Sequence, residues 1–100
     1  MAHKPWSAET IKLREEASAA IDKLARSMHA DRTGWGNFDH LDDEGQKDNS
    51  LDNKQLTAWL VVTQYQGFDD PELSNIVYCT AGQPSATTKG LASFAFEAYG

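Results

Sequence analysis

The stretch from Leu56 to Gln66, LTAWLVVTQYQ, constrains the fold more than any other part of the chain. It combines β-branched and aromatic residues, and apolar side chains fall on both of its alternating faces. This pattern predicts a strand that is covered on more than one side, with Trp59 in the core. One face carries Ala58, Leu60 and Val62, and the other carries Trp59, Val61 and Tyr65.

A second β-rich run, Asn75 to Thr80, follows after a loop that contains Gly67 and Pro71. Since the connection of about eight residues is too short for a crossover helix, the two runs are expected to pair as an antiparallel hairpin. Cys79 lies within the second run, where a small buried thiol is common. Two strands alone make a marginal sheet, so both helices, another chain or part of a long loop should cover the hairpin.

Helices are predicted on both sides of this hairpin. Ser7 is a good N-cap, and apolar residues at spacings of three and four predict an amphipathic helix from Ala8 to His29. A final helix should begin at a cap on Thr87 or Thr88. Gly90 costs that helix up to about 1 kcal/mol relative to alanine, which favours close packing or a later start. The predicted apolar face of the final helix consists of Leu91, Phe94, Ala95 and Ala98.

The predicted fold class is therefore α+β in a single domain of residues 1–100. Its order is an N-terminal helix, a long acidic loop over residues 31–54, a hairpin of about 56–66 and 75–80, and a C-terminal helix. Trp35, Phe38 and Leu41 recur every three residues in the loop. They predict either a short helical turn that packs onto the core, capped by Thr33 or Asn37, or a loop that displays aromatic side chains to a partner.

Charge and composition exclude several function classes. The net charge is −6, and residues 31–100 hold eleven acids against four bases. Such a chain is not expected to bind nucleic acid, which needs clustered Lys and Arg, and a basic protein surface is the expected electrostatic partner. The longest apolar run, residues 58–62, is far short of the about 20 residues that span a membrane. A single cysteine and the lack of an apolar leader favour the cytoplasm.

No catalytic or metal-binding signature is present in the sequence. A calcium loop that starts at Asp42 would need glycine where Lys47 stands and glutamate where Asn53 stands. The three histidines match no zinc spacing, and glycine-rich phosphate loops and nucleophile motifs are absent. We therefore expect no enzyme activity, no metal and no cofactor.

The C-terminal part of the chain carries a family resemblance. LTAWLVVTQYQ followed by IVYCTAGQPSATTKGLASFAFEA resembles small uncharacterised proteins of actinobacteriophages. In these proteins a tryptophan-bearing strand precedes a second strand, a polar loop and a Gly-Leu pair that enters the last helix. The resemblance covers residues 55–98 at most, and it implies a phage-encoded protein that is made in the host cytoplasm. The positions that carry it are Trp59, Gly82, Pro84, Gly90 and Leu91.

These features predict a small non-enzymatic protein-interaction module that binds a host protein with a basic surface. Aromatic side chains would anchor the partner while carboxylates steer its association. One alternative is a homodimer formed through the open hairpin edge or the alanine-rich helix. Another is an enzyme or metal protein that uses His40 with the acidic loop. The predicted partner-binding residues are Trp35, Phe38, Asp39, Asp42, Asp43 and Glu44 in the loop, and Asp69, Asp70 and Glu72 at the hairpin tip.

Overall fold

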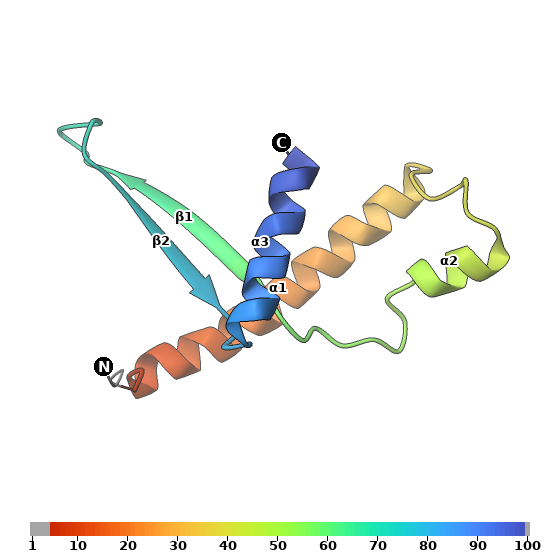
Figure 1. Cartoon of the computed structure of the whole chain (residues 1–100), viewed down its shortest axis with the longest axis horizontal. Coiled ribbons are helices and arrows are strands. Elements are labelled where there is room, and N and C mark those ends of the chain that lie inside the picture. The colour runs from red at the N-terminus through yellow and green to blue at the C-terminus, as the bar shows by residue number, and fades with distance from the viewer. Residues whose placement is uncertain (1–4, 100) are drawn as a thin grey trace. The chain divides into compact units, whose positions relative to one another are not determined.

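The computed structural model describes residues 5–99 and confirms the α+β class. In chain order the elements are two helices, an antiparallel hairpin and a third helix (Figure 1). The chain divides into two compact units, Met1–Leu56 and Thr57–Gly100, which are described one at a time. Because nothing in this division tests how the units fold together, the single domain stays a prediction.

Helix α1, Ala8–Gly34, begins where the sequence indicates but runs five residues further than predicted. Ser7 is the N-cap, and its Oγ accepts a hydrogen bond from the Thr10 backbone N–H at 3.1 Å. Beyond His29 the helix continues through residues 30–33, where alanine and arginine favour helix and the Thr33 hydroxyl donates to the His29 carbonyl. The prediction that loop follows His29 is therefore wrong.

Helix α2, Asp43–Asn49, lies inside the segment that was predicted as loop. Asp42 starts it as N-cap, because its Oδ1 accepts from the Gly45 N–H at 2.7 Å. The predicted helical turn on residues 35–41 is replaced by turns, and Thr33 and Asn37 do not cap a helix there. The short helix thus forms one turn later, where a side-chain acceptor precedes the free N–H groups.

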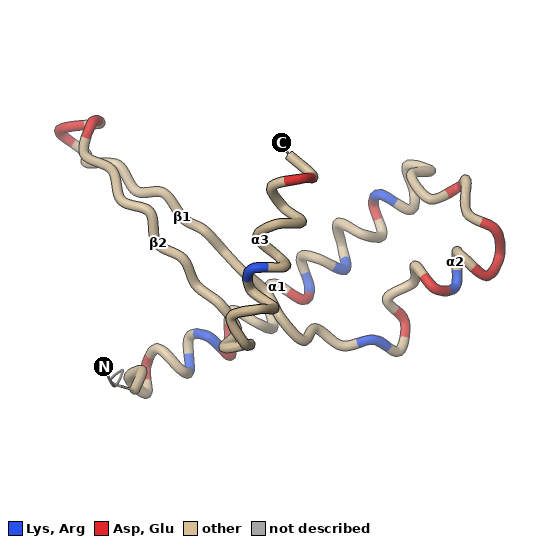
Figure 2. The backbone as a smooth tube through the Cα atoms, viewed as in Figure 1, with Lys and Arg blue, Asp and Glu red and all other residues tan. Residues whose placement is uncertain are grey.

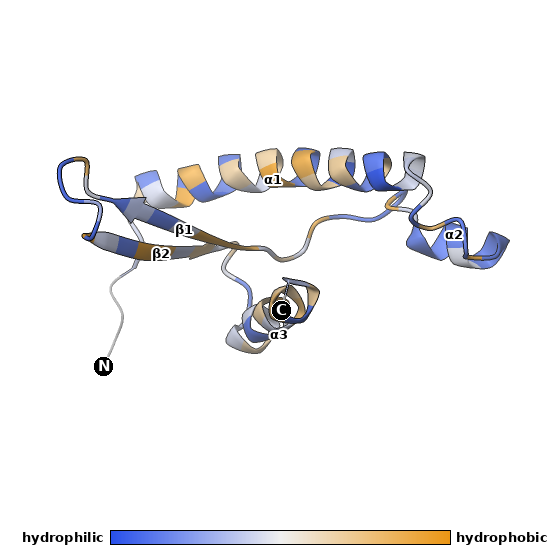
Figure 3. Ribbon diagram, turned by 90° about the horizontal axis from the view of Figure 1, so that it is seen from above, coloured by the Kyte–Doolittle hydropathy of each residue, from blue (hydrophilic) through white to orange (hydrophobic). Residues whose placement is uncertain are grey.

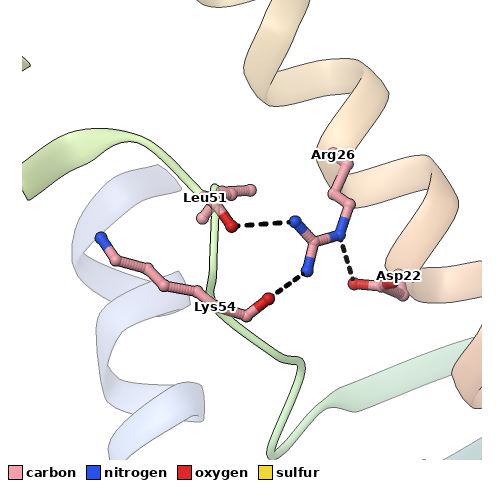
Figure 4. A network of polar contacts seen from close by, with 4 residues as sticks. All are labelled: Asp22, Arg26, Leu51 and Lys54. Carbon is pink, nitrogen blue, oxygen red and sulfur yellow. Dashed lines mark hydrogen bonds and ion pairs between the residues drawn. The ribbon is translucent and has the colours of Figure 1, made fainter. Parts of the chain in front are cut away.

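Arg26 ties α1 to the chain that follows α2 (Figure 4). Its Nε donates to Asp22 Oδ1 at 3.0 Å, which is one of two i, i+4 pairs that the helix sequence offers. The other two guanidinium nitrogens donate to the carbonyls of Leu51, at 3.0 Å, and Lys54. A planar fork with several donors suits this geometry, and it holds the return segment of the first unit against α1.

Strands β1, Leu60–Gln66, and β2, Ser74–Thr80, form the predicted antiparallel hairpin. The predicted start of the first strand at Leu56 is wrong, because the paired segment begins four residues later, at Leu60. The register pairs Leu60 with Thr80 and Gln66 with Ser74, without interruption. Beyond the strands, the Gly67 N–H donates to the Leu73 carbonyl at 2.8 Å. Since hydrogen-bonded pairs alternate along an antiparallel ladder, Thr63 opposite Val77 is such a pair, whereas Val62 opposite Tyr78 is not.

The side-chain amide of Gln83 extends the ladder past the end of the strands. The next hydrogen-bonded pair in this register would be Trp59 with Ala81. Instead, the Ala81 N–H donates to Gln83 Oε1 at 3.1 Å, and Gln83 Nε2 donates to the Trp59 carbonyl at 2.8 Å. Nε2 also donates to Thr88 Oγ1 at 3.0 Å. One amide therefore bridges both strands and fastens the third helix to them.

Helix α3, Ser85–Tyr99, starts directly after Pro84 and makes a small contact with β1. Thr87 and Thr88 are inside the helix rather than at its cap, and their N–H groups donate to the Pro84 carbonyl at 3.0 and 3.2 Å. Proline is compatible with this position because a helix start needs no N–H from it. Both explanations offered for Gly90 are wrong: the helix starts earlier, and a Cβ added there meets no atom within 4 Å.

Burial is the main departure from the sequence prediction. Trp59 is core as predicted, at 7% exposed, and it is the only buried hydrophobic residue in the part of the chain that the structure describes. Val62 and Ile76 are 60% and 63% exposed, so the described residues of this chain do not cover the hairpin as predicted, and cover by another chain stays a prediction. In Figure 3 both strands and α3 carry orange, hydrophobic segments among blue, hydrophilic ones. Among the described residues, no helix combines the length and apolar character that a membrane crossing requires.

Candidate interaction site

The end of α1 places Trp35 in solvent. Gly36 adopts a φ of +86°, its N–H donates to the Thr33 carbonyl at 3.1 Å, and the Asn37 N–H donates to the Arg32 carbonyl at 3.1 Å. These two bonds form a Schellman motif, which glycine permits because it carries no Cβ. The motif turns the chain sharply and leaves the Trp35 side chain 74% exposed.

Phe38 is held in place a few residues later. Its ring centroid lies 5.2 Å from that of His29 on α1, at an interplanar angle of 34°. Gln46 of α2 donates through Nε2 to the Phe38 carbonyl, and at 3.4 Å to the Leu41 carbonyl. Phe38 is half-buried, whereas Trp35 is exposed. Each of the two alternatives predicted for this loop therefore holds for one aromatic residue: Phe38 packs inward, and Trp35 is displayed to solvent.

The four predicted acids of the loop are all exposed and lie close to Trp35 in sequence. Asp39 lies beside Gly36, where its Oδ2 would be 2.8 Å from an added Cβ. Asp42 caps α2, and Asp43 and Glu44 occupy the first turn, where negative charge is favourable to the helix dipole. We call Trp35, Phe38, Asp39, Asp42, Asp43 and Glu44 the loop surface.

The remaining predicted acids lie at the tip of the hairpin, in the second unit. Asp70 Oδ1 accepts from the Glu72 N–H at 3.1 Å, and the Leu73 N–H donates to the Asp70 carbonyl at 3.1 Å. Asp69, Asp70 and Glu72 are exposed, and Figure 2 shows them as the red end of the hairpin. The loop surface and the tip thus belong to different units, and each is a candidate site by itself.

Sequence reasoning missed the apolar residues that accompany the tip and the strands. Phe68, next to Asp69, is fully exposed. Its position between Gly67 and an acidic turn is the sequence feature that could have predicted this exposure. Tyr78 on β2 is 75% exposed, although it was expected in a covered strand. On α3 the predicted apolar face is mostly in solvent, since only Leu91 is half-buried and Phe94 is 73% exposed.

The predicted buried thiol is also wrong, because Cys79 is free and exposed on β2. The structural reason is the same as for Tyr78: no element of its unit covers the middle of β2. Over residues 5–99 no three side chains of histidine, cysteine, aspartate or glutamate gather closely enough to hold a metal ion.

Comparison with known proteins adds no assignment. No protein-family model matches the chain, and neither a curated protein nor a solved structure matches it. The resemblance to actinobacteriophage proteins therefore stays a prediction.

Proposed function

We propose that this chain is a small non-enzymatic interaction protein whose loop surface binds a host protein with a basic surface. The observation that supports this most is the exposure of Trp35, at 74%, on a backbone that is fixed by the Schellman motif. A large aromatic side chain on a rigid turn loses little conformational entropy when a partner buries it. Tryptophan is also the residue most often found at the energetic centre of protein interfaces.

The acidic residues near Trp35 in sequence favour a partner with a basic surface. Residues 31–54 contain seven acids and three bases, which is a net charge of −4. Asp43 and Glu44 are exposed and take part in no ion pair among the described residues, so their charges are available to a partner. Exposed carboxylates of this kind raise the association rate with a basic protein, and added salt reduces the effect. The resemblance to phage proteins suggests that such a partner is present in the host cytoplasm.

A quantitative pull-down from bacterial host lysate tests this function. Bait protein is compared with Trp35→Ala, with a charge-neutral Asp43→Asn/Glu44→Gln variant, and with Trp6→Ala as a matched control. Trp6 is 64% exposed in the same unit but lies outside the loop surface. We expect saturable capture of a basic protein by wild type and by the control, and a loss of at least about tenfold in affinity for Trp35→Ala.

The neutral variant should bind more slowly and lose most of the salt dependence. Asp42 is left unchanged because it caps α2, so the variant changes charge without removing the helix start. Absence of saturable capture at low salt would refute the proposed function. So would a captured protein that binds Trp35→Ala as tightly as it binds wild type.

Self-association is a second candidate function, and a separate observation favours it. Among residues 5–99 no further strand pairs with the outer edges of the two-stranded sheet, and six of the seven residues of β2 are exposed. An open edge of unpaired backbone N–H and C=O groups is a template for a further strand.

A further inference from the structure

We infer that β2 pairs with β2 of a second copy of this chain, antiparallel about a two-fold axis through Val77, to form a four-stranded sheet. This inference rests on the second candidate function, self-association, and adds the strand, the orientation and the register. Backbone groups at the outer edge of β2 are available for this pairing. Because Val77 is hydrogen-bonded to Thr63 of β1, the N–H and C=O groups of Ile76 and Tyr78 point to the outer edge.

These outer groups have no other partner within the described chain. Apart from the ladder with β1, no hydrogen bond in residues 5–99 uses the backbone of Ile76 or Tyr78. Natural edge strands are normally protected by lysine, proline or a bulge. The sequence of β2, SNIVYCT, has neither a charged residue nor proline, and its register with β1 is continuous. The edge of β2 is thus an unprotected one.

The choice of β2 over β1 follows from packing. Helix α3 makes a small contact with β1, and Leu60, Val61 and Thr63 of β1 are half-buried. Residues 74–79 of β2 are all exposed. A neighbouring strand can therefore reach the edge of β2 along its whole length. The apolar side chains that such a strand would meet include Ile76, 63% exposed, and Tyr78, 75% exposed.

A second copy fits this edge because the strand is complementary to itself. Antiparallel pairing centred on Val77 aligns all seven residues of β2, Ser74 with Thr80 of the other copy and Ile76 with its Tyr78. The residues in each of these pairs exchange two backbone hydrogen bonds. Ile76 and Tyr78 lie on one face, where an aliphatic side chain beside an aromatic ring on the neighbouring strand stabilises the pairing.

Charge favours the antiparallel orientation as well. The acidic tip of the hairpin, Asp69, Asp70 and Glu72, lies at one end of β2, and α3 begins just past the other end (Figure 2). Lys89, in the first turns of α3, is the only base in residues 57–100. Antiparallel pairing brings the tip of each copy toward the end of its partner that carries this lysine. Parallel pairing would place the two acidic tips side by side, which like-charge repulsion opposes.

The area of contact sets the expected strength. Pairing along β2 with burial of the outward parts of its side chains covers about 500 Å² per copy, below the roughly 800 Å² of a standard interface. A contact smaller than a standard interface is typical of weak, reversible association, so we expect a dissociation constant in the micromolar range or weaker.

Sedimentation velocity on the full chain tests the dimer over a range of about 1 to 500 μM, which covers weak micromolar association. Val77→Lys places two ammonium groups opposite each other on the axis and should raise the dissociation constant at least about 30-fold. Val62→Lys on β1 is the matched control, at 60% exposed, and should change it less than about twofold.

Disulfide trapping reads the register without relying on the lysine variants. With Cys79→Ala as background, Val77→Cys should form a linked dimer under mild oxidation, because a non-hydrogen-bonded pair brings two Cα atoms to about 4.5 Å. Thr63→Cys in the same background occupies the matching central position on β1 and should stay monomeric. Equal trapping of both variants, or a dimer that survives Val77→Lys, would refute pairing through the edge of β2 but would leave self-association as a function. A monomer at every concentration would overturn both.

Discussion

Replacement of Gln83 tests whether its amide joins the two strands and α3. Gln83→Ala removes three hydrogen bonds, those with the Ala81 N–H at 3.1 Å, the Trp59 carbonyl at 2.8 Å and Thr88 Oγ1 at 3.0 Å. Each is part-buried, and a bond of this kind contributes about 1 kcal/mol net. Since water can reach some of the released groups, we expect unfolding free energy to fall by about 2 kcal/mol.

Gln83→Glu tests the donor role of Nε2 separately from the acceptor role of Oε1. A glutamate keeps an oxygen for the Ala81 N–H, but it sets a carboxylate oxygen against the Trp59 carbonyl, where Nε2 donates in the wild type. Two acceptors at that distance repel, so this nearly isosteric change should destabilise the protein at least as much as alanine does. A purely steric role for Gln83 would leave Gln83→Glu close to wild type.

Urea unfolding followed by tryptophan fluorescence measures both variants. Trp6→Phe and Trp35→Phe in the background leave Trp59 as the only indole, and both replaced residues are largely exposed. Gln64→Ala, an exposed position on β1, is the control and should shift stability by less than about 0.5 kcal/mol. Work at or below about 1 μM keeps the proposed dimer from contributing. If Gln83→Ala matches this control, the bridge does not stabilise the unit.

Three further substitutions test local features by urea unfolding and amide hydrogen exchange. Gly90→Ala should raise stability by up to about 1 kcal/mol, since an added Cβ meets no atom within 4 Å. Gly36→Ala should lower it by about 1–2 kcal/mol, because φ is +86° and Asp39 Oδ2 would lie 2.8 Å from the new Cβ; Gly34→Ala, with open space around its Cβ, is the control and should not lower it. Arg26→Lys keeps the charge but loses the fork, so exchange should quicken after α2 while helical circular dichroism is retained.

Element positions were predictable where a local signal determines them. Ser7 lies before a run of helix formers, and its hydroxyl caps α1 as the sequence predicts. Likewise, the hairpin follows from two β-rich runs and a short loop, and each strand begins within four residues of the prediction. The end of α1 was placed too early because Ala30 to Thr33 tolerate helix, and only the Schellman turn at Gly36 stops it.

Burial could not be predicted in the same way. Val62 and Ile76 have the composition of core strand residues, yet a side chain is buried only if another element reaches it. That depends on the number and placement of elements, which no local pattern encodes. The candidate site shows the same limit, because Trp35 and Phe38 have similar sequence surroundings, and a ring contact with His29 separates the half-buried one from the exposed one.

The amide of Gln83 also limits how this protein can vary in sequence. A side chain that substitutes for a peptide group must arrive at a fixed distance along the chain from Ala81, the residue whose N–H it accepts. Insertion or deletion of one residue between Ala81 and Pro84 would move the Gln83 amide out of reach of the Trp59 carbonyl. The same change would also shift the start of α3. The connection between sheet and helix is therefore a spacer of set length, and within the second unit loop-length variation in related sequences should be confined to the hairpin tip.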